Sequence, residues 1–195
     1  MRRKNKGFTL IELLVVIAII GLLSTMATVA ARYAIDKAKI AKAQHATDTI
    51  YNAIIMLGND TSEWPGHQTP NEVNTTGHVE ICGPDATTPV ALDCGAYTID
   101  SGFAGITAND GTFGSWAGPY MVNISLDPWR HQYFFDTNYN VNSDNVGCGC
   151  DGNSIGCHDV VVVGSYGPDG LGVDKLVTTD NSAQACDDVI KIISF

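Results

Sequence analysis

The chain opens with a long uncharged apolar run that passes into an amphipathic pattern. Residues 13–31 are 19 consecutive residues without a charge, most of them Leu, Val, Ile or Ala. At about 1.5 Å per residue, a helix of this length covers about 28 Å, which is close to the hydrocarbon thickness of a bilayer. The run therefore predicts a helix that lies in lipid or in a similarly apolar surrounding.

Beyond Ala31 the apolar residues recur at spacings typical of an amphipathic helix. They are Ala34, Ala38, Ala41, Ala46, Ile50, Ala53, Ile54 and Leu57. No Pro or Gly interrupts residues 22–57, and Gly58-Asn59-Asp60 is a stop signal. We predict one helix from Thr9 to Leu57, about 75 Å long, whose second half is covered by the rest of the chain.

The remaining residues predict a loop-rich head with a small sheet. Residues 58–115 are rich in Gly, Pro, Thr, Asn and Asp, which favours loops, with Trp64-Pro65 packed on the helix. Three runs rich in aromatic or β-branched residues predict strands: 119–122, 132–135 and 159–163. Three antiparallel strands laid on the helix would bury its apolar face. The predicted fold class is α+β.

Charge divides the chain into three parts. Residues 1–6 hold four basic residues and no acid, residues 8–57 are nearly neutral, and residues 58–195 hold 18 acidic residues against three basic ones. The basic tip before an apolar span predicts a cytoplasmic N-terminus and an exported head. The acidic head argues against direct nucleic-acid binding, which needs a basic face.

Glu12 stands near the start of the apolar span, where a carboxylate is costly in lipid and needs a partner. An ordinary secretory signal, cut near Ala30 or Ala31, does not carry such an acid, and a simple membrane anchor is a second possibility. Cleavage between Gly7 and Phe8 would instead place a new amine within one turn of Glu12. In a pack of such helices, Glu12 of one subunit could neutralise the Phe8 amine of its neighbour and fix one register.

The run Lys6-Gly7-Phe8-Thr9-Leu10-Ile11-Glu12 resembles the prepilin peptidase site of type IV pilins and type II secretion pseudopilins. The resemblance implies cleavage after Gly7, N-methylation of Phe8 and a role for Glu12 in assembly. It divides the chain into a leader (1–7), a transmembrane and filament-core helix (8–31), an amphipathic stem (32–57) and the head (58–195). Val29 stands where many family members have a helix-kinking proline.

Four further motifs resemble the major pseudopilin of type II secretion systems. In chain order they are Trp116-Ala117-Gly118-Pro119-Tyr120, Asp127-Pro128-Trp129-Arg130-His131-Gln132-Tyr133, Ser165-Tyr166-Gly167-Pro168-Asp169-Gly170 and Asp187-Asp188-Val189-Ile190. Residues 58–115 remain unmatched. The second motif predicts a turn in which Asp127 bonds forward to backbone amides and Trp129 is buried.

The C-terminal acidic loop is a candidate calcium site. Asp169, Asp174, Asp187 and Asp188 gather carboxylates that repel one another unless a cation neutralises them. The resemblance implies that Asp169, Asp187 and Asp188 bind calcium through their side chains and Tyr166 through its carbonyl. The long insertion 171–186 leaves a solvated acidic turn as the alternative. A second acidic stretch, residues 144–159, lacks calcium-loop spacing and is better interpreted as a solvated turn.

All six cysteines lie in the head: Cys82, Cys94, Cys148, Cys150, Cys157 and Cys186. Their even number in a loop-rich region favours disulfides in an oxidising compartment. One hypothesis pairs Cys82 with Cys94 and uses the other four to link residues 148–157 to the C-terminus. The alternative is a metal site formed by Cys148, Cys150, Cys157 and His158, although this spacing matches no common zinc pattern.

The histidines and serines show no catalytic or metal-binding spacing, so we predict a non-enzymatic protein. The favoured function is a structural subunit of a type IV-like filament, most specifically the major pseudopilin of a type II secretion system. It would sit in the bacterial inner membrane with a periplasmic head and then enter a helical homopolymer. The resemblance implies prepilin peptidase, minor pilins or pseudopilins and an inner-membrane assembly platform as partners.

Three alternatives remain open. The first is a type IV pilin for adhesion, twitching motility or DNA uptake, which would assemble in the same way. The second is an exported binding module or enzyme with a plain signal peptide. The third concerns the basic residues of the stem. Lys37, Lys39 and Lys42 form a solvated face of the stem or contact acidic groups of a neighbouring subunit.

Overall fold

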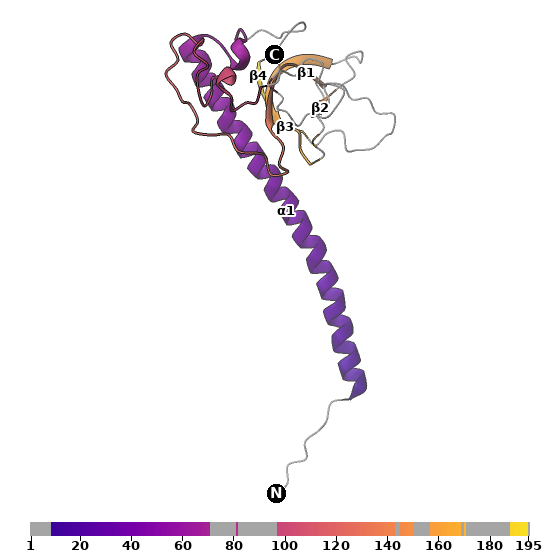
Figure 1. The fold of residues 1–195 in the computed structure, drawn as a ribbon. Helices are drawn as coiled ribbons and strands as arrows, with labels where there is room; N and C mark the ends of the chain where they lie inside the picture. Colours follow the sequence, from indigo (N-terminus) through magenta and orange to yellow (C-terminus); the bar gives the residue numbers. More distant parts are fainter. Residues whose placement is uncertain are drawn as a thin grey trace. The chain divides into compact units, whose positions relative to one another are not determined.

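The structure is a computed structural model, and it describes residues 9–70, 81, 97–142, 145–149, 157–168, 170 and 188–194. In residues 140, 142, 145–149, 157 and 158 it describes the backbone only. The chain forms two compact units, Met1–Lys39 and Ile40–Phe195. The long helix α1 (Leu10–Thr61) contributes to both (Figure 1).

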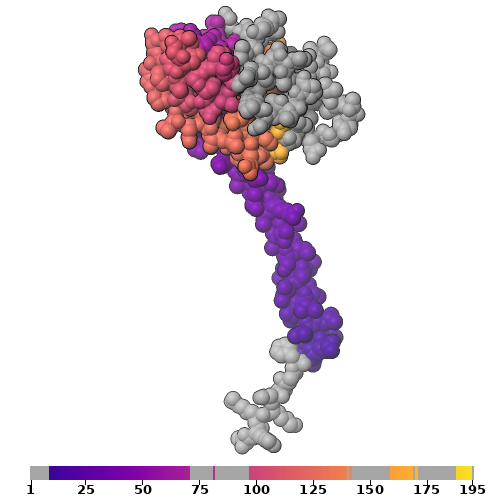
Figure 2. All heavy atoms as spheres, in the orientation of Figure 1, coloured from indigo at the N-terminus to yellow at the C-terminus, as the bar shows by residue number. Residues whose placement is uncertain are grey.

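In the first unit, α1 carries its apolar side chains on every side and buries none of them within the chain. Leu10, Leu22, Met26 and Val29 are each more than 60% exposed. Atoms of this stretch stand free as a rod in the space-filling view (Figure 2), and its large apolar side chains are about half to four-fifths exposed. A helix satisfies its own backbone hydrogen bonds, so such a surface suits an apolar surrounding.

In the second unit, α1 buries one stripe, which consists of Ala43, Thr47, Ile50, Ala53, Ile54 and Leu57. The helix runs past its predicted end at Leu57 and stops at Thr61, where Ser62 adopts a left-handed conformation (φ 61°). The amide of Ser62 donates to the carbonyl of Gly58 over 2.9 Å and closes the last turn. Gly58 thus lies inside the helix, and a Cβ on it would be 2.9 Å from Nε1 of Trp64.

The second unit holds a four-stranded antiparallel sheet in the order β2-β1-β3-β4 (Figure 1). The strands are β1 (Tyr133–Asn142), β2 (Asn145–Gly149), β3 (Cys157–Ser165) and β4 (Val189–Ser194). The α+β class is confirmed, as are the predicted strands at 132–135 and 159–163, which are longer than expected. β2 and β4 were not predicted.

The strand predicted at 119–122 was wrong. This segment is a loop, in which the amides of Tyr120 and Met121 both point to the carbonyl of Ile106 over 2.9 and 3.4 Å. Pro119 has no amide hydrogen to give to a ladder, and the hydroxyl of Tyr120 donates to Asp60 near the end of α1. Tertiary contacts of Tyr120 therefore override its strand propensity.

The sheet has two buried faces. One face packs on the buried stripe of α1, and its core includes Ile50, Ile54, Phe135, Val161 and Val163 together with Trp64, which was predicted to pack on the helix. The other face holds a separate cluster that includes Phe134, Tyr139, Val160, Val162 and Tyr166. The runs of β-branched residues in β3 suit a strand covered on both faces.

Candidate functional site

Glu12 lies in the first turn of α1, where Thr9 and Glu12 cap the helix. The amide and the hydroxyl of Thr9 donate to Oε2 of Glu12 over 2.8 and 2.7 Å. The Glu12 amide points back to Oγ1 of Thr9 over 3.4 Å. This reciprocal Thr-x-x-Glu arrangement is a capping box, which satisfies amides that the first turn leaves without partners.

Only one oxygen of the Glu12 carboxylate takes part in this cap. Both bonds from Thr9 reach Oε2, and within the described part of the chain no hydrogen bond reaches Oε1. The side chain is exposed. The cap therefore fixes the carboxylate near the helix start and leaves one oxygen able to accept from another molecule. The predicted processing residues Gly7 and Phe8 lie outside the described residues.

The helix that follows can enter an apolar phase without leaving side-chain hydroxyls unsatisfied. Ser24 and Thr28 donate to the carbonyls four residues earlier, and Thr25 donates to the carbonyl of Leu22. Among the described residues, α1 is long and apolar enough to cross a membrane. A signal sequence passes the same test, so length and composition do not decide between a span and a signal.

Comparison with known proteins finds a described motif in this segment. Residues 2–28 match the family described as the prokaryotic N-terminal methylation motif. The chain is also similar to a fimbrial protein of Neisseria meningitidis serogroup B (strain ATCC BAA-335 / MC58), with 34% identity over 80 residues. The chain is thus similar to type IV pilin-like proteins. The match covers 41% of this chain and 47% of the relative, so the chain spans about half the length of the curated protein it matches. No solved structure matches it.

In the head of this pilin-like chain, Asp127 joins a turn to the sheet. Its Oδ1 accepts from the amides of Trp129 and His131 over 2.9 and 2.7 Å, and its Oδ2 accepts from the hydroxyl of Ser165 over 2.6 Å. The predicted forward bonds are thus confirmed, although Trp129 is half-buried rather than buried. Burial and the charge of Asp127 raise the pKa of Tyr133 to about 12.

Ser165, His131 and Asp127 lie together without forming a nucleophilic triad. The Ser165 hydroxyl donates to Asp127, and the residue is fully buried. Nδ1 of His131 lies 3.0 Å from the carbonyl of Gly167. A nucleophilic serine would instead be exposed and bonded to an imidazole. These three residues hold the loop after β3 against the Asp127 turn.

Two of the four predicted calcium ligands lie within the described residues, and the sheet brings them together. Ser165 pairs with Val189, so Tyr166 and Asp188 follow and precede these strands at the same end of the sheet. The Tyr139 hydroxyl donates to Oδ2 of Asp188 over 2.7 Å. The other two residues, Asp169 and Asp187, are outside the described residues. The described part of the chain contains no group of three His, Cys, Asp or Glu side chains placed for a metal ion.

Of the six cysteines, two lie in described strands. Cys148 is in β2 and Cys157 in β3, and both strands pair with β1 rather than with each other. Strands two steps apart are separated by about 9.6 Å, beyond the reach of about 7 Å between the Cα atoms of a disulfide. The topology argues against a bond between these two cysteines. Cys82, Cys94, Cys150 and Cys186 lie outside the described residues.

Sequence reasoning missed two contributors. Thr9 was read only as part of the processing motif, although Thr-x-x-Glu before an apolar run is a capping-box signal. Ser165 was part of a motif but had no assigned role, because its partner Asp127 is 38 residues away. A local sequence pattern does not reveal that two residues so far apart in the chain lie next to each other in space.

Proposed function

We propose that this protein is a non-enzymatic structural subunit of a type IV-like filament, and specifically the major pseudopilin of a type II secretion system. The observation that carries the filament proposal is the combination of Glu12, capped by Thr9, with an apolar helix surface that the chain itself leaves exposed. The methylation motif over residues 2–28 supports processing at Gly7-Phe8.

The proposed assembly step is an electrostatic pairing in an apolar environment. The ammonium of a processed Phe8 on one subunit meets Oε1 of Glu12 on the next, while Oε2 stays in its own cap. Pairing removes two uncompensated charges from the apolar phase, and it does so in one register only. The exposed surfaces of residues 13–31 then pack on one another.

The protein would wait in the inner membrane with its N-terminus in the cytoplasm and its head in the periplasm. The orientation is supported by the basic residues 2–6 and the acidic head. Prepilin peptidase, an inner-membrane assembly platform and minor pseudopilins are the proposed partners. Extraction of subunits one by one would lengthen a rod that pushes folded exoproteins outward.

Calcium binding by Tyr166, Asp169, Asp187 and Asp188 stays a proposal. It is supported by the common sheet end that Tyr166 and Asp188 share. A thermal melt with and without chelator tests it: calcium should raise the melting temperature, and an unchanged melt would remove the site.

A type IV pilin for adhesion, motility or DNA uptake is the second candidate, and the similarity to a fimbrial protein favours it. Deletion of the gene separates the two functions. A pseudopilin deletion should abolish secretion of exoproteins and leave surface fibres unchanged in electron micrographs. Loss of long surface fibres with normal secretion would establish the pilin instead.

A further inference from the structure

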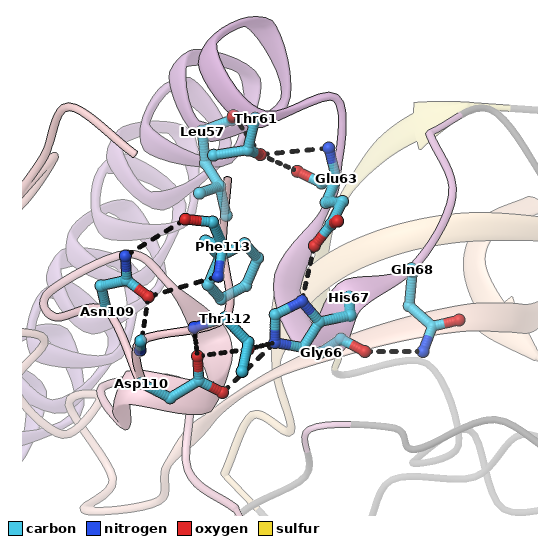
Figure 3. A network of polar contacts seen from close by, with 11 residues as sticks. Leu57, Thr61, Glu63, Gly66, His67, Gln68, Asn109, Asp110, Thr112 and Phe113 are labelled. Atoms are coloured by element: carbon cyan, nitrogen blue, oxygen red, sulfur yellow. Dashed lines mark hydrogen bonds and ion pairs between the residues drawn. The ribbon is translucent and has the colours of Figure 1, made fainter. Parts of the chain in front are cut away.

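A polar cluster joins the end of α1 to a loop of the second unit, apart from the assembly site. The segment after the helix contains η1 (Pro65–His67), and the loop 97–113 contains η2 (Gly102–Ala104). His67 stands between them, with Glu63 on one side and Asp110 with Thr112 on the other (Figure 3). We call residues 97–113 the clasp loop.

The imidazole of His67 has a polar partner at each nitrogen. Nδ1 lies 2.5 Å from Oε2 of Glu63. Nε2 lies 3.2 Å from Oδ2 of Asp110 and 2.8 Å from Oγ1 of Thr112. The ring face stacks on Phe113 with a centroid separation of 3.9 Å. One side chain therefore contacts the segment after α1 and the clasp loop at the same time.

Counting protons shows which form of His67 fits this geometry. Thr112 has one hydroxyl proton, and its oxygen is 2.6 Å from Oδ1 of Asp110. If His67 is doubly protonated, Nδ1 donates to Glu63, Nε2 donates toward Asp110 and Thr112, and the hydroxyl of Thr112 donates to Asp110. If Nε2 loses its proton, its lone pair faces a carboxylate, and Thr112 cannot serve both groups. The imidazolium form satisfies every contact.

The backbone at His67 is held in an unfavourable conformation. His67 has φ 60° and follows Gly66 at φ 74°. The left-handed region is uncommon for residues other than glycine and persists where surrounding contacts impose it. Two backbone hydrogen bonds between Trp64 and Gln68, over 2.8 and 3.2 Å, close the turn that contains Gly66 and His67. The ring contacts with Glu63, Asp110 and Phe113 add to this constraint.

We propose that His67 is a protonation-dependent latch that, as the imidazolium, tightens the contact between the clasp loop and the segment after α1, and loosens this contact when the ring loses its proton. The buried side chains of Ile99, Ala104 and Ile106 keep the loop in the core in both states. The clasp loop also approaches α1 closely at Gly105, where an added Cβ would lie 3.2 Å from Cδ1 of Leu57. The proposal concerns the second unit alone and does not depend on the filament function.

The charged groups that face the ring, among the described residues, are Glu63 and Asp110. Burial lowers the pKa of His67, but the hydrogen bonds from Glu63 and Asp110 and their charges outweigh it, so the net shift is upward. The Thr112 hydroxyl, assisted by its amide and by His67, holds the pKa of Asp110 below its usual value. Asp110 is thus a carboxylate wherever His67 titrates.

The sign of the pH dependence follows from the raised pKa. The folded state binds the proton on His67 more tightly than the unfolded state does. The latch therefore contributes its full stabilisation of the folded state below about pH 6.5. Its contribution is lost as pH rises through the pKa of the folded state. Mildly acidic conditions therefore tighten the contact of the clasp loop with His67, and alkaline conditions loosen it.

Hydrogen–deuterium exchange of the full chain in detergent micelles tests the latch, at pH 6.0 and pH 8.5 with correction for intrinsic rates. Peptides from residues 97–113 should exchange about twofold to tenfold faster at the higher pH, as expected for the loss of one charge-assisted contact. His67→Gln and Asp110→Asn should abolish this step. Asn at 110 can still accept from the Thr112 amide and keep the turn.

His45→Gln is the matched control, because His45 is exposed on α1 and its loss should leave the pH step intact. In a parallel measurement, the ¹³Cε1 resonance of His67 should titrate above about 6.5. An equal pH step in the parent and in both latch variants would overturn the proposal. So would a titration midpoint of His67 at or below the ordinary histidine value.

Discussion

Residues 10–39 and residues 40–61 belong to one helix, yet their apolar side chains meet different surroundings. Ile17 and Leu23 are about 60% exposed, whereas Ile54 and Leu57 are fully buried in the second unit. The second half is stabilised by the chain's own fold, as in any amphipathic helix. Within the described part of the chain, the first half has no such partner, so its apolar surface is available to lipid or to other copies. The predictions below separate these two roles.

The largest effect should come from Glu12→Ala. Loss of the carboxylate removes the proposed partner of a neighbouring Phe8 amine, so filaments should be absent while the subunit is still made and processed. Electron microscopy of sheared filaments, with immunoblots of membrane fractions, measures both. Thr9→Val is the matched variant, because it removes the hydroxyl but keeps the carboxylate, and it should weaken assembly less. Normal filaments from Glu12→Ala would rule out the pairing.

Ile54→Ala and Ile17→Ala compare the two halves directly. Ile54 is fully buried, so its truncation should lower the free energy of unfolding of the second unit by about 2–5 kcal/mol. Ile17 is 61% exposed, and its truncation should leave that free energy unchanged while reducing assembly. Denaturant unfolding in micelles checks both. Equal destabilisation by the two changes would contradict the division of roles.

Asp127→Ala tests the link between the turn and the sheet. The change leaves two amides and the Ser165 hydroxyl without their acceptor. This should lower the free energy of unfolding by about 2–3 kcal/mol. Asp127→Asn keeps one oxygen for the amides and should cost less. If both variants unfold like the parent in denaturant, the turn is held by other contacts.

The smallest effect should come from Lys191→Ala. Nζ of Lys191 lies 3.0 Å from Oδ1 of Asp48 and over the ring of Tyr51, but both charged side chains are about half exposed. Such a pair contributes roughly 0–1 kcal/mol, and salt screens it. Unfolding at low salt should therefore show a small difference from the parent, and this difference should shrink at high salt. A loss above about 2 kcal/mol would show that this contact anchors β4 on α1.

The sequence predicted the elements with strong local signals. The uncharged run predicted the helix, and the spacing of Ile50, Ala53, Ile54 and Leu57 predicted its buried stripe, as the structure confirms. Ala34, Ala38 and Ala41, which were predicted on the same covered face, are exposed instead. Its end was misplaced because Gly58 looked like a stop, while Ser62 provides the left-handed residue that ends the helix.

Weak or misdirected local signals explain the strands that were missed. β2 contains Asn145, Gly147 and Gly149, and both residue types are depleted in strands. Pairing with β1 defines this strand. β4 has β-branched residues, but the preceding Asp187-Asp188 pair favoured a calcium-binding loop at this position. Contacts such as Ser165 with Asp127 and His67 with Asp110 join distant residues, and no local pattern predicts them.

Determination of the mature N-terminus by mass spectrometry tests the central claim most directly. Because the account needs Glu12 to remain in the functional protein beside a new amine, it predicts a chain that begins at N-methylated Phe8. A mature chain that begins near Ala31 or Arg32 would discard Glu12 with the leader and contradict the filament proposal.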